Sequence, residues 1–229
     1  MALKTPESNA PYLGNILSRR TFLGTAAGVI GGILFPLSAQ AADRPIHELR
    51  GNVKVNGKTV DLNTVIHPGD TVVTGADGYI VFVIGTSAFM LRSRSELRIE
   101  MPKAADSEFG LLKLITGALG AVFQKGTPRN LTVINATIGI RGTGVYLETR
   151  GEGAYICTCF GQTELAAVEA PREREWVEAT HHAPRLIGTK RTDGSYFMPA
   201  PFETHTDPEM EMLERCVGRQ VPWVKTGKR

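Results

Sequence analysis

The sequence lacks the short motifs that mark most enzyme active sites. It has no Gly-x-Ser-x-Gly elbow, no Gly-x-x-x-x-Gly-Lys-Ser/Thr phosphate loop, no His-Glu-x-x-His zinc motif and no Cys-x-x-Cys-His haem attachment site. These motifs supply the nucleophile, anion cradle or metal ligands of common reactions. We therefore expect a binding or interaction protein with no catalytic residues, not an enzyme.

The sequence also lacks a large excess of either positive or negative charge. Lys and Arg number 26 against 23 Asp and Glu, which gives a formal net charge of +3, and no basic tract is present. Binding to nucleic acid through its phosphates needs a basic face, so we expect no nucleic-acid partner. The composition, with 42% hydrophobic and 21% charged residues, is that of a folded globular protein.

Only one apolar stretch approaches the length of a membrane span, and it lies at residues 21–37. The paired Arg19 and Arg20 precede it, and the small residues Ala39 and Ala41 follow it. This order resembles a twin-arginine signal peptide over residues 1–41, which predicts export by the twin-arginine translocase to the periplasm. Because that pathway carries folded proteins, cofactor loading before export is one reason to use it. A retained membrane anchor is the alternative, but glycines and Pro36 weaken a run already short for spanning.

From Ile46 onward, short β-branched and aliphatic runs alternate with Gly, Asn-Gly, Asp-Gly and Pro-Gly turns. This punctuation predicts an all-β fold, with Asn56-Gly57 as the turn of the first hairpin. A 3.6-residue period occurs only at 208–218, where we expect one short helix capped by Asp207. The charged segment 171–178 is expected to be a solvated loop. Further strands are expected at 71–74, 79–84, 88–92, 96–100, 111–116, 120–124, 131–134, 142–149 and 155–165.

A family resemblance appears in residues 51–149. The segments that carry it are Gly51-x-Val53-x-Val55-Asn56-Gly57, Pro68-Gly69-Asp70-Thr71-Val72-x-Thr74-Gly75-Ala76-Asp77-Gly78, Leu91-Arg92-x-x-Ser95-x-Leu97-x-Ile99, the segment 114–119, and Ala136-Thr137-Ile138-Gly139-Ile140-Arg141-Gly142-Thr143. In this order and spacing they resemble a FecR domain, the periplasmic β-module named after the iron-dicitrate regulator. The resemblance implies a small bent β-sandwich or roll of short strands that senses a ligand or partner at the cell envelope.

The turn residues within this pattern are expected to be structural. Pro68, Gly69 and Asp70 form a tight corner. Arg141 precedes the turn at Gly142 and Thr143, and we expect it to bond loop carbonyls rather than bind a ligand.

The iron-dicitrate regulator itself has a cytoplasmic anti-sigma segment and a membrane helix ahead of its periplasmic part. Here only residues 1–17 precede the export motif, too few for a folded domain, so we do not expect relay to a sigma factor. A free-standing module is expected instead.

Residues 157–229 hold all three cysteines and three of the five histidines. Side chains at i and i+2 of a strand share a face, so Cys157 and Cys159 present two sulfurs side by side. With His182 and His205, and with His181 as the alternative ligand, they predict a tetrahedral site for Zn, Cu or Fe. The tail is also similar to tails of other small FecR-domain proteins, which carry a Cys-x-Cys strand, a His-His pair and a His-Thr-Asp.

Three alternatives to the metal site stay open. Cys157 or Cys159 can form a disulfide with Cys216 in an oxidising compartment. Both can be inert core residues. Either can pair with His182 in a thiol-dependent enzyme.

Two finer expectations concern neighbouring residues of this region. Pro184 imposes an extended entry at residue 183, so His181 and His182 are expected to project to opposite sides. Asp207 can orient an imidazole, but the helix cap is the favoured role. His47 and His67 are assigned none.

The sequence therefore predicts three parts: a signal peptide at 1–41, a FecR-like β-domain at 42–150 and a C-terminal extension at 151–229. The predicted function is ligand or partner sensing at the envelope by a protein with a Cys/His metal or redox site. The partner is a small ligand or an envelope protein. A structural periplasmic interaction module with a Cys216 disulfide and no metal is the first rival, and a thiol-dependent periplasmic enzyme is the second.

Overall fold

The computed structural model describes residues 44–103, 107–126, 128–151 and 153–224. The predicted signal peptide, with Arg19, Arg20, Ala39 and Ala41, lies outside the described residues. Over the described part of the chain, no helix is long and apolar enough to cross a membrane.

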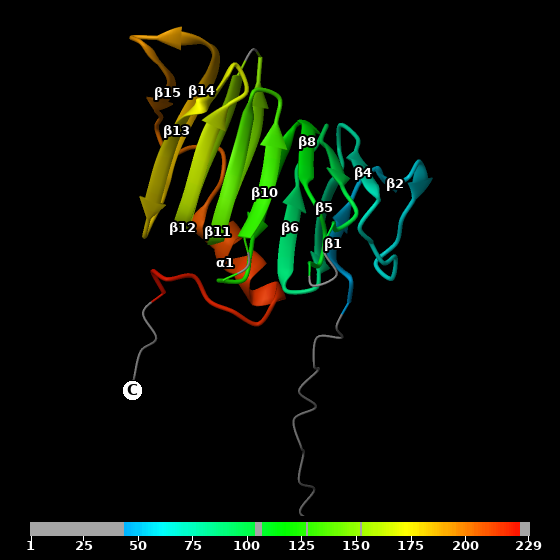
Figure 1. Ribbon diagram of the computed structural model, residues 1–229. Helices are drawn as coiled ribbons and strands as arrows, with labels where there is room; N and C mark the ends of the chain where they lie inside the picture. Colours follow the sequence, from blue (N-terminus) through cyan, green and yellow to red (C-terminus); the bar gives the residue numbers. More distant parts are fainter. Residues whose placement is uncertain (1–43, 104–106, 127, 152, 225–229) are drawn as a thin grey trace, which may run out of the picture. The chain divides into compact units, whose positions relative to one another are not determined.

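The described chain is almost entirely β-structure, as the turn-rich sequence predicts (Figure 1). The strands are β1 (Ile46–Arg50), β2 (Val53–Val55), β3 (Lys58–Thr59), β4 (Thr71–Thr74), β5 (Tyr79–Ile84), β6 (Ser87–Leu91), β7 (Glu96–Ile99), β8 (Leu112–Thr116), β9 (Ala118–Val122), β10 (Pro128–Val133), β11 (Ala136–Arg150), β12 (Gly153–Ala167), β13 (Ala170–Ala179), β14 (Ala183–Thr192) and β15 (Ser195–Pro199). The helix is α1 (Asp207–Cys216).

The strands form one sheet that branches at its two longest members (Figure 1). Strands β11 and β12 pair along their whole lengths as an antiparallel hairpin. One half of β11 pairs with β10 and the other half with β9. Likewise, one half of β12 pairs with β13 and the other with β14. The register shifts between Arg141 and Val145, so the long hairpin bends where its neighbours change.

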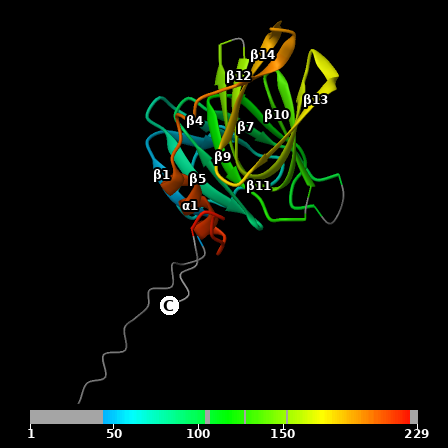
Figure 2. The ribbon, with the colours of Figure 1, turned by 90° about the vertical axis from the view of Figure 1, so that its left-hand side faces the viewer.

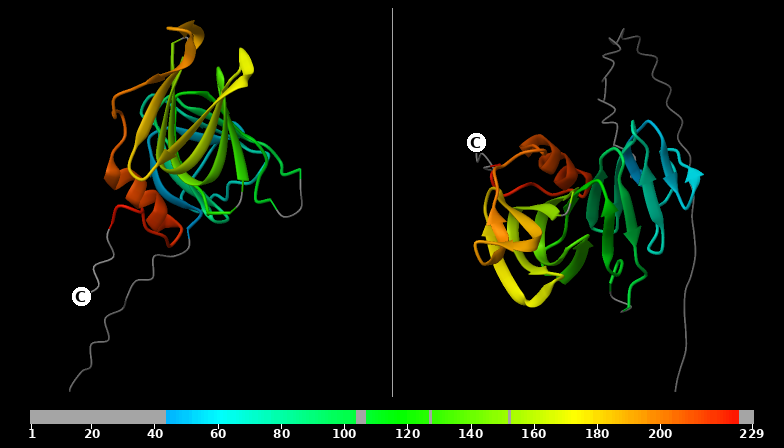
Figure 3. Two further views of the ribbon diagram at one scale, coloured as in Figure 1. Left: turned by 60° about the vertical axis from the view of Figure 1, so that its left-hand side comes forward. Right: turned by 90° about the horizontal axis from the view of Figure 1, so that it is seen from above.

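The sheet curls strongly, so that each face of its central strands is covered (Figure 2). Viewed from above, β12–β15 curl into one half and the blue-to-green strands into the other (Figure 3). Side chains that alternate along β5, such as Ile80 and Phe82, fill the main core inside the curl. Those between them, such as Val81, face a second core with Met210 and Leu213 of α1. Helix α1 therefore covers what would otherwise be an exposed apolar face.

The predicted strands are confirmed to within a few residues, but β10, β11 and β12 are longer than expected. The expected strands 142–149 and 155–165 are parts of the 15-residue strands β11 and β12. The expected loop at 171–178 is wrong, because these residues lie in β13. There the charged side chains pair across strands, as Arg174 does with Glu164 at 2.7 Å.

The predicted turn residues lie in tight corners. Asn56 and Gly57 have the positive φ angles of a hairpin turn (51° and 79°). Gly69 has φ 98°, and Asp70 accepts hydrogen bonds from the His67 N–H (2.7 Å) and the Asn56 side-chain amide (2.6 Å). The Asp70 carboxylate thus joins two corners.

The corner at 141–143 differs from the expectation in one respect. Gly142 has φ 60°, and Thr143 is buried and bonds the Gly144 carbonyl (3.2 Å). The Arg141 side chain is exposed and lies over the ring of Trp176 at 5.4 Å, and it bonds no loop carbonyl of the described residues.

The described residues 44–224 belong to one compact unit. The expected border between residues 150 and 151 falls at the end of β11. Both expected parts, 42–150 and 151–229, therefore contribute strands to the same sheet.

Candidate metal centre

The Cys-x-Cys pair lies on the first half of β12, on the face covered by α1. Cys157 and Cys159 are fully buried and belong to the second core, with Tyr146 of β11 beside them. Residues 154–160 are all buried, because this half of β12 has β11 and β14 on its edges and a core on each face. The two sulfurs share a face, as a spacing of two in a strand predicts.

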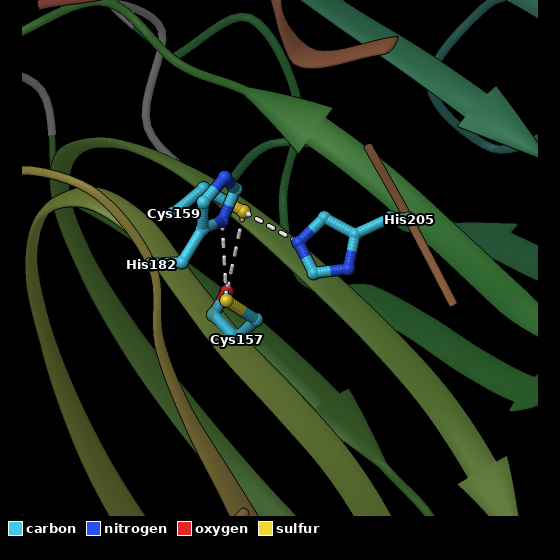
Figure 4. Close-up of side chains that lie close together, drawn as sticks. All are labelled: Cys157, Cys159, His182 and His205. Carbon is cyan, nitrogen blue, oxygen red and sulfur yellow. Dashed lines mark hydrogen bonds between the residues drawn. The ribbon is translucent and has the colours of Figure 1, made fainter. Parts of the chain in front are cut away.

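His182 reaches the sulfurs from the connection between β13 and β14. Its backbone N–H donates to the Cys159 carbonyl oxygen at 2.9 Å, and its φ of 52° is in the left-handed region. Its Nδ1 lies 3.6 Å from the Cys157 Sγ (Figure 4). Only 5% of the His182 side chain is exposed, and the ring of Phe202 stacks on it at 4.0 Å.

His205 enters from the segment between β15 and α1. Its ring stacks on Tyr146 at 4.4 Å with an interplanar angle of 8°, which fixes the plane of the imidazole. Its Nε2 lies 3.3 Å from the Cys159 Sγ, on the side of the cluster opposite His182 (Figure 4). The residue is 3% exposed.

The structure therefore brings together Cys157, Cys159, His182 and His205, the four residues that the sequence suggests as ligands. Two sulfurs and two ring nitrogens all lie within 4.8 Å of one another. The ring nitrogens that face away from the sulfurs have partners of their own. His205 Nδ1 is 3.0 Å from the Glu203 carbonyl oxygen, and His182 Nε2 is 2.7 Å from the Asp207 carboxylate. Such partners orient imidazole ligands in metalloproteins, so this buried group can hold a metal ion.

The role of Asp207 differs from the expectation. The N-cap of α1 is Thr206, whose backbone N–H donates to the Glu209 carboxylate at 2.9 Å, and Asp207 is the first residue of the helix. The prediction of Asp207 as the cap is wrong, because Thr206 and Glu209 form the capping box. The Asp207 carboxylate instead bonds the imidazoles of the His-His pair.

His181 does not join the four-residue cluster. Its Nε2 lies 3.0 Å from both Asp207 oxygens, and 49% of its side chain is exposed. The two histidine rings are 4.7 Å apart. The expectation that they project to opposite sides is wrong, because the positive φ of His182 replaces the extended backbone that would separate them.

The electrostatics of the metal-free cluster separate the two thiols. A hydrogen bond from the Cys159 thiol, together with bonds from His182 and His205, outweighs burial and lowers the pKa of Cys157 to about 4. Burial and the neighbouring Cys157 raise the pKa of Cys159. Burial disfavours charge on His182, but its bonds to Cys157 and Asp207 prevail and raise its pKa. The pair thus holds one thiolate next to an imidazole.

Cys216 lies apart from this group, on α1. It is a free thiol, as are the other two cysteines, so the disulfide considered as an alternative is not formed in this structure. Its Sγ contacts the Met212 sulfur at 3.9 Å, and burial raises its pKa to about 11. Cys216 is therefore a half-buried thiol whose sulfur contacts a thioether.

Several supporting residues were not found from the sequence. The histidine rings pack against three aromatic side chains, Tyr146, Phe202 and Trp223. The Tyr155 hydroxyl accepts a hydrogen bond from the Glu203 N–H at 3.3 Å. Aromatic residues in strands read as ordinary core, so no local signal marked them. The His-Thr-Asp run at 205–207 was the one available signal for the carboxylate.

Comparison with known proteins finds similarity only among solved structures. No family model matches the chain, and no curated protein sequence matches it. Among solved structures, it is similar to two crystal structures, at 1.65 and 2.50 Å resolution, of a protein from Parabacteroides distasonis described as a "putative anti-sigma factor". Both are 12% identical, with TM-scores of 0.44 and 0.45, and each alignment covers 57% of this chain and 58% of that one. The similarity thus spans little more than half of either chain.

Proposed function

We propose that this protein is an exported envelope protein that binds one transition-metal ion at Cys157, Cys159, His182 and His205. The observation that carries the proposal is the convergence of two sulfurs and two ring nitrogens within 4.8 Å in a buried core, with each outer ring nitrogen hydrogen bonded. A tetrahedral set of two thiolates and two imidazoles is typical of zinc, which is our first candidate.

The cluster favours a structural or sensory metal over a catalytic one. Catalytic zinc keeps one position for water or substrate, whereas here four protein ligands fill the tetrahedron. Cys157 and Cys159 are fully buried, so no substrate reaches them in this conformation. The ligands come from β12, the β13–β14 connection and the segment before α1. A bound ion would therefore fasten the C-terminal segment to the sheet.

The place of action follows from the sequence. The twin-arginine pattern at residues 1–41 supports export to the periplasm, and the FecR-like pattern at 51–149 supports sensing of a ligand or docking to an envelope partner. In this proposal, binding or loss of the metal ion decides whether α1 stays packed on the face of the sheet that it covers.

The first experiment is elemental analysis of the exported protein, purified without chelator or affinity metal. We expect about one metal ion per chain, lost in a Cys157→Ser/Cys159→Ser variant because two of four ligands are removed. Cys216→Ser is the matched control, since this thiol lies outside the cluster, and it should retain the ion. A metal-free wild-type protein would contradict the proposal.

Export is tested separately by cell fractionation. An Arg19→Lys/Arg20→Lys variant should remain in the cytoplasm while the wild-type protein reaches the periplasm. Equal export of both would remove the twin-arginine part of the proposal and leave the metal site unaffected.

One observation favours a second candidate, a thiol-dependent enzyme. Cys157, His182 and Asp207 align as a thiol, a base and an orienting carboxylate, and the Cys157 pKa of about 4 is that of an activated nucleophile. Rapid alkylation of Cys157 by iodoacetamide in untreated protein would support it. We expect the opposite, that Cys157 in untreated protein reacts slowly, because burial and coordination both block the sulfur.

A further inference from the structure

The feature that remains is the group of ligand atoms just outside the buried cluster. His181 Nε2, His182 Nε2 and the Asp207 carboxylate lie within 4.8 Å of one another, with Asp207 2.7 Å from His182 and 3.0 Å from His181. The His181 and Asp207 side chains are 49% and 37% exposed, whereas the sulfurs are fully buried. Two imidazoles and one carboxylate form a common open set for divalent transition metals.

His182 belongs to both groups of ligand atoms. Its Nδ1 faces the Cys157 sulfur and its Nε2 faces Asp207. The buried and the exposed groups are therefore the two sides of one imidazole ring, and they form a continuous series of ligand atoms from solvent to the inner cluster.

We propose that His181, His182 and Asp207 form an outer metal site that captures a divalent transition-metal ion from solvent and transfers it to the buried cluster. This inference rests on the proposed function for its purpose, because the inner cluster is the destination. The outer set has only three protein ligands, so water completes the coordination and the ion exchanges readily.

Proton balance makes the two sites alternate. A neutral imidazole has one free lone pair, and its other nitrogen carries a proton. When the outer ion binds, His182 Nε2 provides the lone pair and Nδ1 holds the proton. When the inner cluster is filled, Nδ1 releases its proton to solvent and binds the metal, while Nε2 takes up one proton from solvent and donates it to Asp207, so the ring stays neutral. Any thiol that becomes a ligand also releases its proton to solvent. The outer site then has one ligand fewer, so it binds a second ion more weakly.

The experiment uses Co(II) as the probe, added to metal-free protein. Removing the inner ligands with Cys157→Ser/Cys159→Ser should leave the outer site alone. One Co(II) per chain should then bind while free Co(II) is present, without thiolate-to-cobalt absorption, and this ion should be lost when the protein is purified away from free metal. Adding His181→Ala to this variant should abolish that binding, and adding His67→Ala, an exposed histidine elsewhere, should not. No binding to the double variant, or equal binding after His181→Ala, would overturn the outer site. A Cys157→Ala/Cys159→Ala pair repeats the test if the serine variant does not fold.

Transfer of the metal ion to the inner cluster is measured in protein that retains both Cys157 and Cys159. His181→Ala should slow the appearance of thiolate-to-cobalt absorption and leave its final amplitude unchanged, while His67→Ala changes neither. Equal rates would overturn the capture role. If the wild-type protein never develops this absorption, the inner site of the proposed function fails. The capture role then fails with it, and the Cys-to-Ser variant still decides whether the outer site exists.

Discussion

Asp207 links the exposed and the buried imidazoles of the centre. Its carboxylate bonds both histidines, and these bonds outweigh its partial burial and lower its pKa. Replacing a partner of this kind typically costs about 10- to 100-fold in metal affinity, which we expect for Asp207→Asn in a chelator competition assay. Asp193→Asn, in an exposed turn away from the cluster, is the control and should bind as the wild type does. Unchanged affinity in Asp207→Asn would contradict the orienting role.

The thiolate of Cys157 gives a pH prediction for the metal-free protein. Because folding lowers this pKa from 9.0 to about 4, the thiolate should be present at neutral pH and lost near pH 4. The linked stability is fully present above pH 9.0 and lost as the pH falls through about 4. Ultraviolet thiolate absorbance should show this titration in wild type and Cys216→Ser but not in Cys157→Ser. A titration near pH 9 in the wild type would contradict it.

At the residue scale, the sequence predicted which four residues would come together but not their surroundings. The spacing of Cys157 and Cys159 fixes their common face, which is a local property of a strand. The position of His182 depends on a positive φ at a non-glycine residue, which sequence patterns rarely reveal. The same backbone conformation brings His181 onto Asp207, so the outer group was missed for the same reason.

At the element scale, the bend of the β11–β12 hairpin depends on glycine. A Cβ at Gly144 would lie 2.3 Å from the ring of Phe160, its partner within the bend, and that ring packs against Trp223 at 5.7 Å. We expect Gly144→Ala to lower the free energy of unfolding by about 1–3 kcal/mol through overpacking, measured by urea denaturation. Gly139→Ala in the same strand is the control, because its Cβ meets Glu164 at an ordinary 3.6 Å. Equal stability of the two variants would show that the Phe160 ring moves aside at no cost, which would contradict the prediction.

Strand positions were predictable where turns end them, and strand lengths were not. Gly, Asn-Gly and Pro-Gly turns mark the short strands from β2 to β8 because those residues supply φ angles that others avoid. In β12, residues 154–160 are buried on both faces, so the alternation that marks a half-exposed strand is missing. In β13 the charged residues pair across strand edges, and such a segment reads as a loop when its neighbours are unknown.

At the scale of the whole molecule, the four residues of the cluster come from segments far apart in the chain. Residues 157, 182 and 205 meet only in the folded state, so an ion that binds there stabilises folding. At a thousandfold excess of free metal over its Kd the gain is about 4 kcal/mol, a rise in Tm of roughly 8 to 16 °C for a domain of this size. Chelator should lower the Tm accordingly in wild type and Cys216→Ser, by scanning calorimetry. A chelator effect of equal size in Cys157→Ser/Cys159→Ser would contradict the assignment.

Trp223, in the turn after α1, has a further consequence. Its ring lies 4.6 Å from His181 and 5.3 Å from His182, while the chain's other tryptophan, Trp176, is exposed on β13. In a Trp176→Phe background, all indole fluorescence therefore originates beside the metal ligands. Quenching by a paramagnetic ion such as Cu(II) or Co(II) would then follow occupancy in real time, so the protein carries its own optical reporter of metal arrival.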